Sequence, residues 1–241
     1  MKDIVNKIKQ ISGRYPTSEV FFDWVKMMAY AISNAMETNT VIYEKREEMY
    51  KNIMKKYNKD EQNGFCEMYG MLTIEMEKGM KDVLGEIYMD SEIYNKHLGQ
   101  FFTPYNLCRM MAEVIEVPEM KEGEYITVNE PSCGAGSNII AFADQMKEKG
   151  INYQEHMIAT CQDLDWNVVY MCYVQMSLYG IPAIVVQGNT LSEPYTGGYG
   201  ENVFYTPVYI LNRLKFRKQK TMELPKFETK EGSNGQMELV F

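Results

Sequence analysis

The chain has 241 residues, of which 45% are hydrophobic and 24% are charged. These are ordinary globular values, so they exclude the disordered, collagen-like and low-complexity classes, and the length suits one large domain or two small ones. No apolar run approaches the ~18 residues of a membrane span, and the polar start MKDIVNKIKQ is unlike a signal peptide. We therefore expect a cytoplasmic protein with no membrane partner.

Charge and cysteine content narrow the classes further. The net charge of −8 is uneven, because residues 1–98 carry −2, residues 99–212 carry −9 and residues 213–241 carry +3. An acidic middle segment is a poor surface for duplex DNA unless a partner supplies Lys and Arg. The five cysteines and two histidines show no metal-ligand spacing. The sequence therefore predicts reduced thiols and no metal site.

Residues 1–98 read as a helical N-terminal domain. Apolar residues at helical spacing mark a first helix from Ile4 to Ile11. After the turn that ends at Pro16, a longer apolar stretch runs from Val20 to Met36. Two more helical patterns run from about Val41 to Tyr57 and from about Phe65 to Met80. No catalytic constellation is visible here, so these patterns are interpreted as core and interhelix packing.

Residues 99–212 alternate between strand and helix. Strands are predicted at 125–129, 157–162 and 183–187, with helices at 137–149 and 166–179 between them. Gly150 and Gly180 end the two helices. This order predicts an α/β, Rossmann-like and mainly parallel sheet, in which ligands bind beyond the carboxyl ends of the strands.

A nucleoside site is predicted at those carboxyl ends. The segment Glu130–Asn138 (EPSCGAGSN) follows the first strand, and its glycines permit a tight turn close to a ligand. A tight turn without a ligand is the alternative. Asp163 ends the second strand, where a carboxylate can accept both ribose hydroxyls. The spacing and glycine pattern depart from the dinucleotide fingerprint, so NAD is disfavoured.

Several motifs in one order resemble the adenine-N6 DNA methyltransferases, and most closely the modification subunits of type I restriction systems. They are, in chain order, Asp82–Tyr88 (DVLGEIY), Gly99–Pro104 (GQFFTP), Glu130–Gly136 (EPSCGAG), Gln162–Asp165 (QDLD) and Gly188–Leu191 (GNTL). The resemblance covers about residues 80–195, roughly half of the chain. It implies a Rossmann-like methyltransferase domain over residues 99–212 that uses S-adenosyl-L-methionine.

The resemblance also implies which residues bind this cofactor. They are Thr103 and Pro104 at its methionine end, Glu130, Ser132, Gly134 and Gly136 in the glycine-rich loop, Asp163 at the ribose, Leu164 against the adenine ring, and Asn189 at the adenine amino group. Asn189 stands where the family usually has Asp, and an amide presents either a donor or an acceptor. Thr103 has a turn or helix-cap alternative, and Gly188-Asn189 is also a turn dipeptide.

The catalytic element is the weakest part of the resemblance. The family holds the target amino group with an (Asn/Asp)-Pro-Pro-(Tyr/Phe) turn, on a base taken out of the duplex, and this chain has no such tetrapeptide. The candidate in position is Thr206–Tyr209 (TPVY), so the predicted catalytic residues are Thr206, Pro207 and Tyr209. Tyr209 has a core or loop alternative. About thirty residues follow, too few for the remaining strands of a complete methyltransferase sheet.

The sequence predicts that residues 213–241 form a basic tail with a hairpin near Gly232–Gly235. Its basic stretch has two interpretations, a solvated surface or a contact with nucleic acid or a partner. The basic residues are Arg213, Lys215, Arg217, Lys218 and Lys220.

The functional hypothesis is a DNA adenine-N6 methyltransferase subunit in a homo- or hetero-oligomer, with a partner chain that recognises DNA. The missing tetrapeptide argues against activity by this chain alone. The rival hypothesis is a catalytically silent S-adenosylmethionine-binding module that regulates or assembles a complex. A different nucleotide-binding enzyme on the same fold is the third.

Overall fold

A computed structural model describes residues 1–90, 102–218, 220–222, 228–231 and 237–240. The described residues of the N-terminal part form five helices, of which the sequence predicts the first four. They are α1 (Lys2–Ile11), α2 (Thr17–Asn34), α3 (Thr40–Met54), α4 (Lys59–Glu77) and α5 (Val83–Tyr88). Polar caps fix three of their starts: Asn39 accepts hydrogen bonds from the first turn of α3, and Asn58 forms a capping box with Glu61 on α4. Asp82 accepts the Gly85 N–H at the start of α5. No helix in the described ranges is long and apolar enough to cross a membrane.

The N-terminal helices share an apolar core with the rest of the chain. Helix α2 packs along α9 (Trp166–Leu178), and both are among the most apolar helices described. A hydrogen bond of 2.8 Å joins the Tyr30 and Tyr170 hydroxyls across this contact. A second bond runs from the Leu84 N–H to Gln175 Oε1 at 3.0 Å. The predicted boundary near residue 98 falls outside the described residues and stays a prediction.

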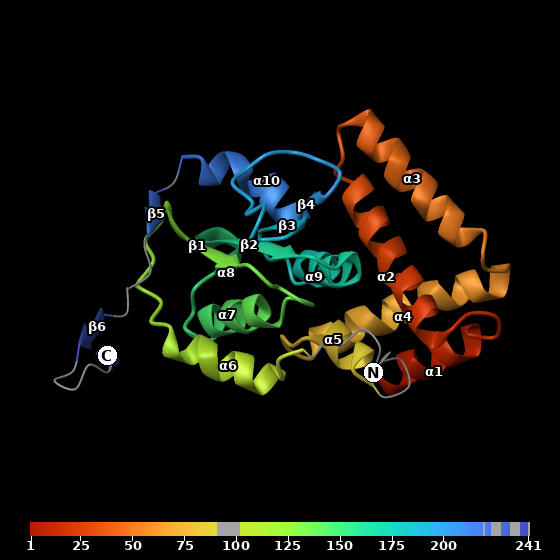
Figure 1. Ribbon diagram of the computed structural model, residues 1–241, viewed down its shortest axis with the longest axis horizontal. Coiled ribbons are helices and arrows are strands. Elements are labelled where there is room, and N and C mark those ends of the chain that lie inside the picture. Colours follow the sequence, from red (N-terminus) through yellow and green to blue (C-terminus); the bar gives the residue numbers. More distant parts are fainter. Residues whose placement is uncertain (91–101, 219, 223–227, 232–236, 241) are drawn as a thin grey trace.

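The second part of the chain is a five-stranded sheet with helices on both faces (Figure 1). Its elements are α6 (Tyr105–Val114), β1 (Glu124–Glu130), α7 (Ser137–Glu148), α8 (Tyr153–His156), β2 (Met157–Asp163), α9, β3 (Ala183–Gln187), β4 (Val203–Tyr205), α10 (Pro207–Phe216) and β5 (Lys220–Met222). The strand order is β4-β3-β2-β1-β5, and β1 lies parallel to both β2 and β5, as β2 does to β3. The predicted α/β, mainly parallel sheet is confirmed.

Strand β4 runs antiparallel to β3, and this changes where the following residues lie. Val186 pairs with Val203, and Ile184 pairs with Tyr205. The carboxyl end of β4 therefore meets the amino end of β3. Residues after Tyr205 begin at the edge of the sheet opposite the one where β1, β2 and β3 end.

The two faces of the sheet differ in how well they are covered. Helices α7 and α9 lie on one face and α10 on the other (Figure 1). Beneath α7 and α9 the inward residues of β1 and β2, such as Ile126 and Cys161, are completely buried. On the other face, which we call the α10 face, Thr127 and Asn129 of β1 are exposed.

The end of the predicted tail forms a separate two-stranded sheet, whereas its first residues complete α10 and supply β5 of the main sheet. Strand β6 (Glu228–Glu231) pairs antiparallel with β7 (Met237–Val240), as the predicted hairpin requires. The turn predicted near 232–235 lies outside the described residues, and so do the first three residues of the GQFFTP motif, 99–101.

Candidate functional site

The loop between β1 and α7 turns sharply beside the end of β2. Gly134 and Gly136 have φ angles of +50° and +97°, in the left-handed region that favours glycine. The Cys133 N–H donates to the Gln162 carbonyl at 3.0 Å, and the Gly136 N–H donates to the Cys133 carbonyl at 2.8 Å. These bonds fix the loop at the carboxyl edge of the sheet, where the sequence predicts the cofactor.

The two glycines serve different purposes. A Cβ on Gly136 would lie 2.6 Å from the Met176 side chain and 3.2 Å from Cys172 Sγ, so this glycine lets α7 pack against α9. A Cβ on Gly134 would make only ordinary contact with the Phe102 ring at 3.5 Å. Gly134 therefore lies on the open side of the loop, which is the side that a ligand can approach.

Asp163 joins the loop to β2 through its carboxylate. Its Oδ2 accepts the Gly134 N–H at 2.9 Å, and its Oδ1 accepts the Asp165 N–H at 3.1 Å. An ionised carboxylate offers about four lone-pair positions, so both oxygens retain capacity for further donors. Such an acceptor pair at the end of a strand suits the two hydroxyls of a ribose.

A cavity of about 210 Å³ lies over this loop. Thr103, Ser132, Gly134 and Asp163 all line it, so the structure brings these four predicted residues together. Ligand pockets usually measure ~300–1,000 Å³, so the enclosed space holds only part of a nucleoside ligand.

Asn138 supplies an acceptor that has no partner. Its amide nitrogen donates to Glu130 Oε2 at 2.9 Å, which places the predicted Glu130 one hydrogen bond away from the cavity. Its Oδ1 is buried and forms no hydrogen bond with any residue that the structure describes. Buried polar atoms are normally satisfied, so an unpaired acceptor in the cavity wall fits a ligand that brings a donor, such as an ammonium group. The acceptor oxygens of Asn138 and Asp163 therefore fit the amino-acid and ribose parts of S-adenosylmethionine, respectively.

Thr103 lines the cavity, whereas Pro104 lies outside its lining and directly precedes α6. Pro104 is the residue that precedes the helix, so it sets the direction of the chain after Thr103. The Cys108 thiol donates to the Thr103 carbonyl at 3.7 Å. Burial raises the pKa of this thiol to about 11, so it stays protonated and keeps the donor.

A buried polar cluster supports the loop from beneath. The Asp82 carboxylate accepts hydrogen bonds from the Ser137 hydroxyl, from Gln175 Nε2 at 2.7 Å and from the Gly85 N–H at 2.8 Å. Gln175 also donates to the Ala135 carbonyl at 2.9 Å. Burial raises the pKa of Asp82, and the three hydrogen bonds oppose that shift. The cluster links the DVLGEIY motif to the start of α7.

Leu164 and Asn189 lie at the same edge but outside the cavity wall. Leu164 is 66% exposed, and its carbonyl accepts a bond from Gln187. The Asn189 Oδ1 accepts the Leu191 N–H at 3.0 Å, as in a turn. The structure thus leaves the apolar Leu164 surface available beside Asp163, while the Asn189 oxygen already has a local donor.

The structure does not bring Thr206, Pro207 and Tyr209 to the edge where β1, β2 and β3 end and the cavity lies, which we call the cofactor edge. Because β4 is antiparallel, Thr206 lies at the start of β3, where it is completely buried. Its Oγ1 accepts the Ala183 N–H and donates to the Ile181 carbonyl, both at 2.8 Å. Pro207 is the first residue of α10, and Tyr209 lies on that helix. The hydroxyl is thus committed to the backbone and lies at the wrong edge for the predicted role.

Sequence reasoning missed six of the residues that line the cavity, among them Phe102 and Asn138. Phe102 belongs to the GQFFTP motif and was a visible signal, whereas Asn138 is recognisable only through its unpaired oxygen. No group of three metal-ligating side chains occurs among the residues that the structure describes.

The fold and the site together define a Rossmann-like α/β protein with a nucleoside-cofactor edge, the class to which S-adenosylmethionine-dependent methyltransferases belong. The N-6 DNA Methylase family matches residues 79–230, which is more than half of the chain. The chain therefore belongs to this family, and its cofactor is S-adenosylmethionine.

One relative and one solved structure illustrate the similarity. The methylase subunit of the type I restriction enzyme MjaIX from Methanocaldococcus jannaschii is 30% identical over 84 residues, which cover 33% of this chain and 14% of that protein. The chain thus spans a small share of that relative. A Listeria monocytogenes crystal structure, described as a class I S-adenosylmethionine-dependent methyltransferase, covers 91% of this chain and 71% of its own, at 9% identity and a TM-score of 0.30.

Proposed function

We propose that this chain is the cofactor-binding part of a DNA adenine-N6 methyltransferase and acts with a partner chain that recognises DNA. Membership of the N-6 DNA Methylase family supports the reaction class. The similarity to a type I methylase subunit supports a multi-chain enzyme. The observation that carries the proposal is the convergence of Thr103, Ser132, Gly134 and Asp163 on one cavity at the carboxyl edge.

Each residue of this edge has a role in the proposal. Asp163 accepts the ribose hydroxyls with the lone pairs that its two backbone donors leave open. The Asn138 amide nitrogen donates to Glu130, and its unpaired oxygen accepts a hydrogen bond from the ammonium group of the amino-acid part. Leu164 packs against the adenine ring with its exposed side chain. The bound cofactor supplies a methyl group activated by a positively charged sulfur.

A partner chain is proposed for the DNA because this sheet is acidic. Residues 99–212 carry a net charge of −9, and phosphate binding depends on Lys and Arg. The target base must leave the duplex before its amino group can reach the methyl donor. Thr206 is not given a role in that step, because its hydroxyl is buried and paired at the opposite edge.

The same placement of Thr206 favours a second candidate function. A cofactor edge without an accompanying base-binding turn would make the chain a silent module, which binds S-adenosylmethionine to regulate or assemble a complex. Strand β5 lies beside β1, and its described part ends at Met222, so no described residue reaches the cofactor edge from that side.

A methyl-transfer assay distinguishes the two candidates. Adenine-containing duplex DNA and radiolabelled S-adenosylmethionine are incubated with this chain alone and with the chains encoded beside it. The methyltransferase predicts label in N6-methyladenine that depends on a partner and is lost in Asp163→Ala, but not in the matched variant Asp60→Ala on the exposed start of α4. A silent module predicts cofactor binding without transfer in any combination. Absence of cofactor binding would contradict both.

A further inference from the structure

A second cavity, of about 430 Å³, lies on the α10 face of the sheet. Aromatic and cationic side chains dominate its wall, and we call it the tyrosine–arginine cavity. Its lining includes Tyr199, Tyr205, Tyr209, Arg46, Arg213 and Arg217. It shares no lining residue with the cavity at the cofactor edge.

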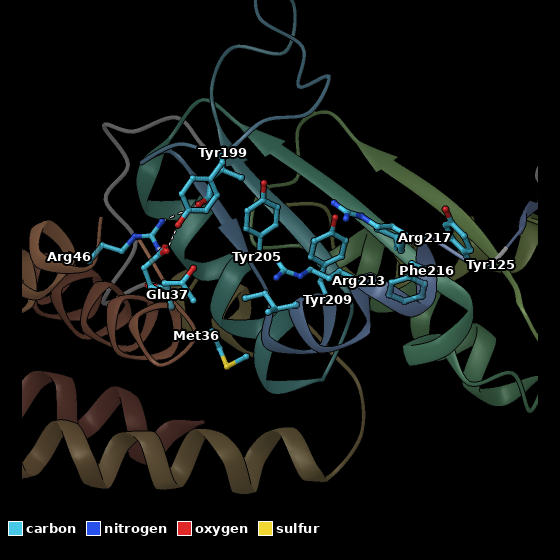
Figure 2. Close-up of a pocket in the computed structure, with 15 residues that line it drawn as sticks. Met36, Glu37, Arg46, Tyr125, Tyr199, Tyr205, Tyr209, Arg213, Phe216 and Arg217 are labelled. Atoms are coloured by element: carbon cyan, nitrogen blue, oxygen red, sulfur yellow. Dashed lines mark hydrogen bonds and ion pairs between the residues drawn. The ribbon is translucent and has the colours of Figure 1, made fainter. Parts of the chain in front are cut away.

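Three tyrosine rings form a stacked row along this cavity (Figure 2). The Tyr199 and Tyr205 ring centroids are 6.0 Å apart with planes within 7°, and the Tyr205 and Tyr209 centroids are 5.4 Å apart with planes within 14°. The Tyr205 hydroxyl donates to the Gly198 carbonyl, and the Tyr199 hydroxyl donates to Glu37. The anchored rings thus present an ordered aromatic surface before any ligand arrives.

Two arginines in the wall have no acidic partner in the described part of the chain. Arg46 is paired with Glu37 at 3.1 Å, but the side chains of Arg213 and Arg217 form no ion pair or hydrogen bond with any residue that the structure describes. Three arginines against one glutamate give the wall a charge of +2, in a chain whose net charge is −8. Figure 2 shows the Arg213 and Arg217 guanidinium groups beside the Tyr209 ring.

The charge state of Tyr209 agrees with this geometry. Burial raises the pKa of Tyr209, while the positive charges of Arg217 and Arg213 act in the opposite direction. Both guanidinium groups therefore lie within electrostatic reach of the Tyr209 hydroxyl, which stays protonated at neutral pH and remains a hydrogen-bond donor.

We propose that the tyrosine–arginine cavity binds a nucleotide, with the base against the tyrosine row and the phosphate between Arg213 and Arg217. Aromatic faces accept any base by stacking, and planar guanidinium groups bind phosphate oxygens in pairs. The volume lies within the usual range for small-ligand pockets. The site is separate from the cofactor edge and does not depend on the proposed methyltransferase function. A free nucleotide and a nucleotide within a single strand share this chemistry.

Calorimetry with thymidine monophosphate tests the proposal. Its pyrimidine differs from the adenine of the cofactor, so binding at the other cavity does not confuse the result. Thymidine and inorganic phosphate are titrated separately. We expect the nucleotide to bind at least tenfold more tightly than either part, because stacking and phosphate binding act together. A short single-stranded oligothymidine shows whether the natural source is a strand: tighter binding than the mononucleotide, with the same arginine dependence, assigns it to one.

Variants of α10 locate the binding. Arg213→Gln with Arg217→Gln removes both free charges from exposed positions and should weaken nucleotide binding at least tenfold. Lys215→Gln is the matched control, because Lys215 lies on the same helix but pairs with Glu155 at 2.7 Å and is not part of the wall. Asp163→Ala should leave nucleotide binding unchanged.

Several outcomes would overturn the proposal. They are no binding of the nucleotide or the oligonucleotide, equal binding by the double arginine variant and the wild type, phosphate binding as tight as nucleotide binding, and loss of binding in Asp163→Ala alone. The last result would place the ligand at the cofactor edge instead.

Discussion

The cofactor edge and the α10 face of the same sheet differ in the kinds of chemical group that line them. At the cofactor edge, backbone groups and short polar side chains dominate, and the Gly134 N–H and Asp163 carboxylate hold each other in place. On the α10 face, large side chains form the wall of the cavity, and they include three stacked tyrosines and three arginines. A loop that must approach a ligand closely needs glycine, whereas a platform for a flat ligand needs ring area.

The two regions also differ in how they are secured. The cofactor loop is tied to β2 by main-chain bonds within the sheet domain. The α10 face depends on contacts from the N-terminal helices, because Arg46 of α3 donates to the Val203 carbonyl at 3.0 Å and lies over the Phe204 ring at 4.2 Å. Damage to α3 should therefore reach the α10 face before it reaches the cofactor edge, whereas damage to α5 should reach the cofactor loop through Asp82.

The largest effect should come from Arg46. Its side chain and that of Glu37 are only 7% and 6% exposed, so Arg46→Met leaves a buried carboxylate without its positively charged partner. We expect the free energy of unfolding, measured with urea, to fall by about 4 kcal/mol. Lys45→Met breaks an exposed pair with Glu201 and should cost less than ~1 kcal/mol. Similar losses in both variants would show that the Arg46 pair does not secure this face.

Gly136 should give the next largest effect, this time at the cofactor edge. Gly136→Ala combines left-handed strain of ~1–2 kcal/mol with a clash against Met176, so we expect a loss of about 3 kcal/mol in unfolding free energy. Gly150→Ala has a similar φ of +75° but meets nothing within 4 Å, so only the strain should appear. If the two losses were equal, close packing of α7 on α9 would not be the reason for this glycine.

Thr206 separates a structural role from a catalytic one. Thr206→Val removes the partner of the Ala183 N–H and of the Ile181 carbonyl, which should lower the unfolding free energy by about 2 kcal/mol. Thr206→Ser keeps the hydroxyl and should recover most of that loss. Calorimetry should show unchanged cofactor affinity in both. A Thr206→Val protein of normal stability that had lost methyl transfer would return this residue to the catalytic site.

Asp82 should give the smallest effect, seen in the pH dependence of stability. Burial raises its pKa in the folded state, so its protonated form stabilises the fold below the unfolded value of ~3.9. That contribution is lost as the pH rises through the folded pKa. Asp82→Asn keeps a neutral acceptor, so wild-type stability should rise relative to the variant as the pH falls from 8 to 4. Parallel urea-denaturation curves across this range would contradict the buried-charge account.

The sequence predicted the parallel part of the fold because its patterns are local. Periodic apolar residues and the glycines at 150 and 180 mark β1 to β3 and their helices, and all of these elements are observed. The direction of β4 is not local. Val203–Tyr205 is only three residues long, and its antiparallel pairing with β3 depends on the whole loop that precedes it.

The site shows the same division. Glycines with positive φ and a carboxylate after a strand leave clear signals, so Gly134 and Asp163 were predictable. The separation of Thr206 from them was not, because tetrapeptide similarity carries no information about which edge the segment reaches. The tyrosine–arginine cavity was also invisible, since Tyr199, Arg46 and Arg213 meet only through tertiary packing.

The central claim, a cofactor site at the carboxyl edge of the sheet, is tested most directly by calorimetry. S-Adenosylmethionine is titrated into the wild type, Asp163→Ala and the Arg213→Gln/Arg217→Gln variant. Loss of two charge-assisted hydrogen bonds should weaken binding to Asp163→Ala by about 100-fold, while the double arginine variant should bind like the wild type. Equal affinity in Asp163→Ala and wild type, or no binding to the wild type, would contradict a cofactor site at the carboxyl edge of this sheet.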